Sequence, residues 1–193
     1  MDEQLIIKLN KKYIQKLRNL SVSHKKFIIC FSGFSGSGKT YISRILEKRY
    51  KAIRIRNDDI RKIIMKMKIK EVDELTYSYL DWLLKNWKFK NKLIILDSGI
   101  DRRYFKIFPI FNKNKYPVFI IRLNTSKQTA YRRAFERSKG KDQHFIDNID
   151  RWVKEWEDFG KEVKSNIVID NEDYLNLKPL FEILDKKLNR GFL

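Results

Sequence analysis

The chain has 193 residues and a single cysteine, Cys30, which excludes an internal disulfide. This length favours one domain of α/β size with an adequate core of its own. Lys and Arg number 43 against 24 Asp and Glu, giving a formal charge of +19. That charge favours a polyanionic partner, although a bias towards Lys, Ile and Asn would produce it too. No apolar run is long enough for a bilayer and no signal peptide is recognisable, so we expect a cytoplasmic protein without membrane contact.

Residues 2–20 form the first predicted element. Apolar residues recur there at helical spacing, at Leu5, Leu9, Ile14 and Leu17, with lysines between them. The pattern predicts an amphipathic helix that packs against the domain, within an N-terminal helical extension at 1–26. A helix lying on a membrane surface is the alternative.

A glycine-rich turn follows the first predicted strand, at 27–32, and leads into a helix that reaches about residue 50. Its sequence Gly33-x-x-x-x-Gly38-Lys39-Thr40 matches the phosphate-binding P-loop pattern in full. Backbone N–H groups of such a loop, together with the positive end of the helix, bind phosphate. Lys39 is expected to reach the β- and γ-phosphates of ATP, and Thr40 to bind Mg²⁺. The residues predicted to bind the nucleotide are Gly33, Ser35, Gly36, Ser37, Gly38, Lys39 and Thr40.

Strands and helices alternate through the rest of the chain. We expect further strands at 52–56, 92–97, 117–123 and 166–170, and helices at 60–67, 72–87, 101–112, 126–137, 146–163 and 177–188. The alternation predicts an α/β fold with a five-stranded, mainly parallel sheet and helices on both faces. No linker or repeat interrupts it, so 1–193 is expected to be one domain, with a helical lid at about 126–163.

Acidic residues follow the second and third predicted strands, at the edge of the sheet where ligands bind. Asp58 is the predicted general base for a hydroxyl acceptor, and Asp59 is its fallback. Asp59 and Arg61 are assigned to acceptor binding, Arg61 through a charged contact. Asp97 is expected to bind Mg²⁺ directly or through water. The structural alternatives are a helix cap for Asp58, a turn cap for Asp97 and a solvated charge for Arg61.

Two arginines of the predicted lid, Arg133 and Arg137, lie four residues apart and therefore on one helix face. They precede the polar stretch 138–143, and we expect them to stabilise the transferring phosphoryl group as an arginine finger does. A solvated basic face is the alternative. Trp152 and Trp156 also share a helix face, for which core packing is favoured over stacking on bases.

Together these residues resemble the P-loop kinases, especially the small AAA_33-type kinases and the kinase domain of phage polynucleotide 5′-hydroxyl kinase. Gly33-Phe-Ser-Gly-Ser-Gly-Lys-Thr40 is similar to their Gly-Leu-Pro-Gly-Ser-Gly-Lys-Ser/Thr loop, and Asn57-Asp-Asp-Ile-Arg61 to their Arg-Asp-Asp-x-Arg motif. The resemblance implies the P-loop NTPase fold with strand order 2-3-1-4-5. It also implies ATP and Mg²⁺, Asp58 as the base, and lid arginines between Arg133 and Arg137.

The resemblance leaves the phosphate acceptor open. A nucleic-acid or nucleotide hydroxyl, such as an RNA or DNA 5′ end, ranks slightly above a small metabolite. The loop also looks like that of adenylylsulfate kinases, but those carry Asp-Gly-Asp-Asn-Val-Arg where this chain reads Arg56-Asn-Asp-Asp-Ile-Arg61. An acceptor-free ATPase or nucleotide switch, and a basic nucleic-acid-binding protein, are the other hypotheses. The acceptor is expected to bind among the helices between Asp58 and Trp87.

Overall fold

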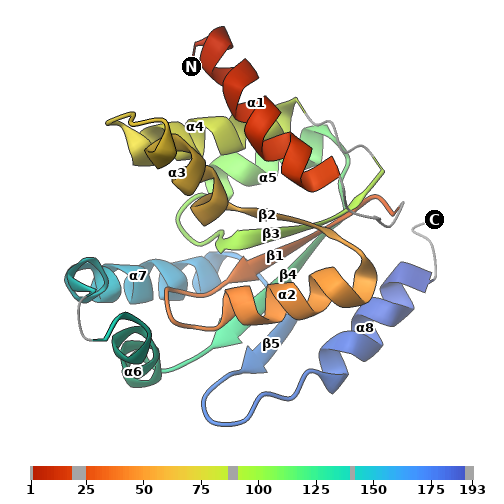
Figure 1. The fold of residues 1–193 in the computed structure, drawn as a ribbon. Coiled ribbons are helices and arrows are strands. Elements are labelled where there is room, and N and C mark those ends of the chain that lie inside the picture. Colours follow the sequence, from red (N-terminus) through yellow and green to blue (C-terminus); the bar gives the residue numbers. More distant parts are fainter. Residues whose placement is uncertain (1, 19–24, 87–90, 140–141, 190–193) are drawn as a thin grey trace. The chain divides into compact units, whose positions relative to one another are not determined.

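The computed structural model describes residues 2–18, 25–86, 91–139 and 142–189. Figure 1 shows the elements, which in chain order are α1 (Glu3–Arg18), β1 (Phe27–Ser32), α2 (Lys39–Tyr50), β2 (Ile53–Arg56), α3 (Asn57–Lys66), α4 (Val72–Lys85), β3 (Leu93–Gly99), α5 (Tyr104–Lys113), β4 (Val118–Asn124), α6 (Lys127–Ser138), α7 (Gln143–Glu162), β5 (Ile167–Asp170) and α8 (Lys178–Asn189). Trp87, where the fourth predicted helix was expected to end, lies outside the described residues.

The five strands form one sheet with the order β2-β3-β1-β4-β5. β2 pairs with β3 and β4 with β5, both in parallel. All six residues of β1 are buried, as expected for a parallel strand covered on both faces. The predicted fold class and strand order are therefore confirmed.

Helix α3 begins three residues earlier than predicted, at Asn57. Asp58 and Asp59 consequently belong to its first turn, where carboxylates are stabilised by the positive end of the helix dipole. The main chain of this turn is also held from a distant part of the sequence, because the Tyr13 hydroxyl accepts a hydrogen bond of 3.2 Å from the Arg56 N–H. Burial raises the pKa of Tyr13 well above its ordinary value, so this hydroxyl stays protonated.

The chain divides into two compact units. Unit 1 comprises Met1–Ile28, Ser43–Ser98 and Phe105–Val118, and unit 2 comprises Ile29–Ile42, Gly99–Tyr104 and Phe119–Leu193. Each unit has its own packed core.

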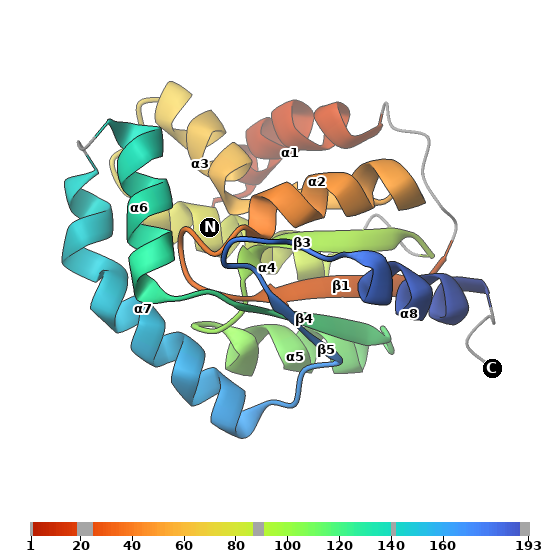
Figure 2. The same ribbon diagram turned by 90° about the horizontal axis from the view of Figure 1, so that it is seen from below.

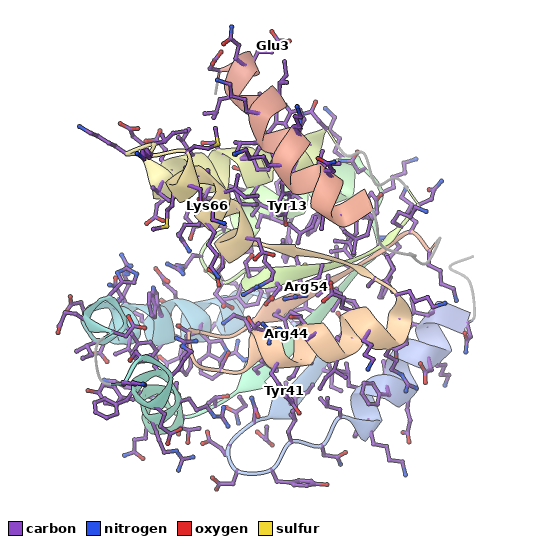
Figure 3. All side chains as sticks on the ribbon, in the orientation of Figure 1. Glu3, Tyr13, Tyr41, Arg44, Arg54 and Lys66 are labelled. Atoms are coloured by element: carbon purple, nitrogen blue, oxygen red, sulfur yellow. The ribbon has the colours of Figure 1, made fainter. Side chains whose placement is uncertain are left out.

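In unit 1, helix α3 contacts both α1 and α4, as Figure 1 shows. Of the predicted apolar face of α1, Leu9, Ile14 and Leu17 are buried in the core and Leu5 is half-buried. Tyr13 is also buried there. Tyr13, labelled in Figure 3, meets Tyr79 of α4 edge-to-face at 6.1 Å between ring centres. The Tyr79 hydroxyl donates to the side chain of Asn10 at 2.9 Å. Helix α1 therefore packs on the domain, as its amphipathic pattern predicts.

In unit 2, α6 and α7 lie side by side (Figure 2) and enclose a small apolar core. That core also contains Phe34 of the glycine-rich loop, and its members are Phe34, Ala130, Ala134, Phe145, Ile149 and Trp152, with Val153 and Trp156 packed against them. The loop is thus attached to both helices through one aromatic side chain. Among the described helices, none is both long and apolar enough to cross a membrane.

Candidate active site

The glycine-rich loop between β1 and α2 has a backbone that only glycine fits at two positions. Gly36 and Gly38 have φ angles of +86° and +95°, in the left-handed region. A Cβ added to Gly36 would lie 2.7 Å from the Ala130 carbonyl oxygen, and one added to Gly38 would collide with the side chain of Asn171. Ala130 and the side chain of Asn171 therefore lie directly against the loop and leave no room for a larger residue at these two positions.

Three side chains that the sequence analysis missed hold this loop in place. Asp101 Oδ2 accepts a hydrogen bond of 2.9 Å from the Gly33 N–H. Asn171 Nδ2 donates to the Ser37 carbonyl at 2.7 Å, and the Thr125 hydroxyl donates to the same carbonyl at 3.4 Å. Each follows the end of a strand by one or two residues, and this position is the sequence signal that could have identified them.

Lys39 curls back over its own loop. Its Nζ donates to the carbonyl oxygens of Gly33 and Phe34, at 2.6 and 2.7 Å, and lies 3.5 Å from the Ser37 hydroxyl. Lys39 and Thr40 form the start of α2, where the helix dipole favours an anion. The loop, with Ser35 at its half-buried turn, therefore combines an ammonium group with a helix N-terminus at one place.

The two arginines of the predicted lid have different surroundings. Arg133 Nη2 donates to the Glu172 carbonyl at 2.6 Å, and its buried Nη1 has no hydrogen-bond partner among the described residues. Arg137 is exposed and lies 3.7 Å from the Asp142 carboxylate. Residues 140 and 141, in the middle of the predicted lid, lie outside the described part of the chain. Arg133 is thus fixed in unit 2, whereas Arg137 is a surface charge.

In unit 1, two arginines of β2 surround Asp97. Asp97 Oδ2 accepts from Arg54 Nη1 at 2.8 Å and lies 3.1 Å from Arg56 Nε, and its side chain is only 1% exposed. Burial alone would lower the pKa of Arg54, but its hydrogen bonds to Glu47 and Asp97 raise it overall, so the guanidinium remains charged. The sequence signal for this pairing is the arginine at every second position of Ile53-Arg-Ile-Arg56, which places both guanidinium groups on one face of the strand.

Arg56 also connects Asp97 to the first turn of α3. Its Nη1 lies 3.3 Å from Asp59 Oδ1 and its Nη2 lies 3.4 Å from Asp58 Oδ2. Three of the predicted acidic site residues therefore share a single guanidinium. This arrangement relieves the repulsion that three neighbouring carboxylates would otherwise exert.

Asp58 and Arg61 lie together at the surface of unit 1. The Asp58 side chain is 58% exposed, and its Oδ1 accepts from Arg61 Nη1 at 3.2 Å. Arg61 Nε donates to Asp73 at 2.9 Å. Burial lowers the pKa of Arg61, but its hydrogen bond to Asp73 raises it overall, so Arg61 is a permanent cation. Asp58 is thus accessible to a ligand, as a general base must be.

The predicted site residues are divided between the two units. The nucleotide loop, Arg133 and Arg137 belong to unit 2, and the acidic group with its arginine belongs to unit 1, namely Asp58, Asp59, Arg61 and Asp97. In unit 1 the four residues are joined through ion pairs of Arg56 and Arg61.

Two of these side chains carry the oxygen donors that Mg²⁺ prefers. Thr40 offers a hydroxyl in the first turn of α2, and Asp97 offers a carboxylate. Because Asp97 Oδ2 already accepts a hydrogen bond from Arg54 and lies 3.1 Å from Arg56 Nε, Asp97 suits a contact through water better than direct coordination. The described residues contain no group of three or more His, Cys, Asp or Glu that would hold a metal ion alone.

Comparison with known proteins identifies the family. Residues 28–155 match the AAA_33 family, an AAA domain. A chain from the PezAT chromosomal toxin–antitoxin system of Streptococcus pneumoniae has a TM-score of 0.66 at 16% identity, over 90% of this chain and 79% of that one. No curated protein matches the chain in sequence.

A shikimate kinase and a gluconokinase share the fold. Shikimate kinase from Acinetobacter baumannii, in complex with shikimate, has a TM-score of 0.56 at 16% identity, over 90% of this chain and 98% of that one. A gluconokinase from Sinorhizobium meliloti 1021 has a TM-score of 0.54 at 17% identity, over 85% and 90%. At these identities the likeness concerns the fold. The chain therefore belongs to the AAA_33 family and has the P-loop fold found in these kinases.

Proposed function

We propose that this chain is an ATP-dependent phosphotransferase that moves the γ-phosphate of ATP to a hydroxyl group. The observation that carries the proposal is the glycine-rich loop, with Lys39 Nζ hydrogen-bonded to the loop carbonyls at 2.6 and 2.7 Å. Membership of the AAA_33 family and the kinase fold support the same conclusion.

In this proposal the loop binds the donor nucleotide. The backbone N–H groups between Gly33 and Thr40 bind the phosphate oxygens, and Lys39 exchanges its loop carbonyls for the β- and γ-phosphates. Thr40 would hold Mg²⁺ directly, and Asp97 would hold it through water. When bound, the metal ion neutralises charge on the β- and γ-phosphate oxygens. Asp101, Thr125 and Asn171 keep the loop in its binding conformation.

Asp58 acts on the acceptor. The acceptor hydroxyl oxygen forms the new bond to the γ-phosphorus while the bond from that phosphorus to the β–γ bridging oxygen breaks, releasing ADP. The proton of the hydroxyl passes to the Asp58 carboxylate, with Asp59 as the fallback base. Arg61 and Asp59 contact the acceptor, and Arg133 and Arg137 stabilise the charge of the transferring group.

The remaining hypotheses differ in the acceptor that they predict, and one labelling experiment tests all of them. The purified chain is incubated with γ-labelled ATP, Mg²⁺ and separate pools of 5′-hydroxyl oligonucleotides, nucleosides, sugars and adenylylsulfate. Label in an acceptor is the expected result, and Lys39→Met, which removes the ammonium group, is expected to abolish it. Label appearing only as inorganic phosphate would instead identify an ATPase or nucleotide switch. Salt-sensitive nucleic-acid binding without transfer would indicate a nucleic-acid-binding protein.

A further inference from the structure

Helix α1 lies outside the segment that matches the AAA_33 family, which begins at residue 28. It is nevertheless part of the core of unit 1, because it contacts α3 and buries Leu9, Tyr13 and Leu17, each of which is at most 6% exposed. Helix α3 carries Asp58, the proposed base, in its first turn. An element beyond the family segment therefore packs on the helix that supplies the acceptor side of the site.

The junction between β2 and α3 is held from outside the sheet. β2 is the outermost strand and has a neighbouring strand, β3, on one side only. An N–H group that points away from such an edge strand needs a partner that is not a strand. The Arg56 N–H donates to the hydroxyl of Tyr13, labelled in Figure 3, at 3.2 Å. Tyr13 thus supplies the hydrogen-bond acceptor that the sheet does not provide at this position.

The start of α3 lacks the local anchor that many helices have. Arg56 is its N-cap residue, and its side chain makes no capping hydrogen bond within the described part of the chain. Arg56 is instead held by Tyr13 through its main chain and by Asp97 through its side chain, whose Nε lies 3.1 Å from Asp97 Oδ2. Asp58 follows only two residues later, so the position of its carboxylate depends on how Arg56 is held.

The Tyr13 ring is itself fixed by α4. It is 1% exposed and meets the Tyr79 ring edge-to-face at 6.1 Å between ring centres. Tyr79 is fully buried, and its hydroxyl donates to Asn10 Oδ1 of α1 at 2.9 Å. Burial raises the pKa of Tyr13 and the negative charge of Asp59 raises it further, because the Tyr13 hydroxyl lies near the acidic first turn of α3. A hydroxyl held this firmly can fix the main chain that it binds.

We infer that Tyr13 is a positioning residue for phosphate transfer: its hydroxyl fixes the first turn of α3 and thereby directs the Asp58 carboxylate at the acceptor hydroxyl. The inference rests on the proposed function, in which Asp58 takes the acceptor's proton. The Asp58 side chain is 58% exposed, so its place is set mainly by the main chain that carries it. A general base must lie within hydrogen-bond reach of the proton, and a displacement of about 1 Å can lower a rate on the order of 100-fold.

A purely structural role for Tyr13 predicts a different result. Removal of a buried hydroxyl lowers stability wherever the hydroxyl lies, so Tyr13 and Tyr79 would then behave alike. The two hydroxyls differ in what they bind, because Tyr13 holds the main chain next to Asp58 and Tyr79 holds Asn10 of α1. Tyr79 is therefore a matched control in the same unit, and a catalytic difference between the two isolates the effect on Asp58.

The test compares Tyr13→Phe with Tyr79→Phe, each of which removes one hydroxyl and keeps the ring. Single-turnover transfer from γ-labelled ATP is measured at saturating ATP, with whichever compound takes up most label among 5′-hydroxyl oligonucleotides, nucleosides, sugars and adenylylsulfate. Tyr13→Phe is expected to lower the rate about 10- to 100-fold, with the KM for ATP unchanged. Tyr79→Phe should stay within about twofold of the wild-type rate, although urea denaturation should show similar losses of stability for both variants.

A double-mutant cycle shows whether Tyr13 acts through Asp58. In an Asp58→Asn background, Tyr13→Phe should have almost no further effect on the transfer rate, because the group that Tyr13 positions is already inactive. An undiminished effect in that background would overturn the inference, as would a wild-type rate in Tyr13→Phe or an equal loss of rate in Tyr79→Phe. Failure of the proposed function gives a different result, because the wild-type protein itself would then label no acceptor and both ideas would be refuted.

Discussion

Arg56 Nε lies 3.1 Å from Asp97 Oδ2, and the two residues are directly paired where β2 and β3 run in parallel. Arg54, labelled in Figure 3, donates to the same carboxylate oxygen at 2.8 Å. A carboxylate that is 1% exposed therefore has two guanidinium partners, and one of them also reaches Asp58 and Asp59. Removing either partner should leave a buried charge less well compensated.

Arg56→Gln is expected to lower the free energy of unfolding by about 2 kcal/mol, the typical value of a hydrogen bond to a charged group. Urea denaturation followed by circular dichroism measures the change. Arg61→Gln is the matched control, because Arg61 pairs with exposed carboxylates and should cost less than about 1 kcal/mol. Equal losses of unfolding free energy in the two variants would show that pairing with Asp97 stabilises the fold no more than the surface ion pairs of Arg61 do.

Gly36→Ala is expected to weaken ATP binding at least tenfold. The added Cβ would lie 2.7 Å from the Ala130 carbonyl oxygen in a backbone with φ of +86°, so the loop must shift. Isothermal titration calorimetry with ATP and Mg²⁺ measures the effect. Tyr41→Ala, which changes a side chain that is 62% exposed in the first turn of α2, serves as the control and should bind ATP normally. Normal ATP binding by Gly36→Ala would mean that the loop tolerates a different shape.

The contact between Glu172 and the start of α6 is expected to make the stability of the fold depend on pH. Hydrogen bonds from Thr129 and from the Ser126 N–H and hydroxyl lower the pKa of Glu172. A carboxyl group with a lowered folded-state pKa adds stability above its unfolded pKa of about 4.3 and loses it as the pH falls further. Glu172→Gln should therefore reduce the melting temperature at pH 7, and the difference from wild type should shrink below pH of about 4. A difference that stays constant from pH 7 to pH 3 would contradict this assignment.

Most of the fold could be predicted from local patterns in the sequence. The loop Gly33–Thr40 is a contiguous motif, and buried parallel strands are continuous apolar runs, so both were visible without tertiary information. The strand order came from the resemblance to P-loop kinases. Helix α3 was misjudged because Asp58 and Asp59 were taken for strand-end residues, although acidic residues also favour the first turn of a helix.

The partners of the site residues were much harder to predict. The pairing of Arg56 with Asp97 depends on the register between β2 and β3, which no local pattern encodes. Asn171 reaches Ser37 across 134 positions of the sequence. Trp152 was expected to pack in the core, and it does, but its unmet indole N–H becomes apparent only when its neighbours are known.

The central claim is that the phosphate-binding loop and Asp58 act in the same phosphoryl transfer, and Asp58→Asn tests it most directly. This variant keeps the size of the side chain but cannot accept the proton. With an identified acceptor, single-turnover transfer of γ-label should fall by a factor on the order of 10²–10⁴, while the Kd for ATP remains that of the wild type. Asp59→Asn is measured in parallel to exclude the neighbouring carboxylate. Full transfer by Asp58→Asn with normal ATP binding would contradict the account.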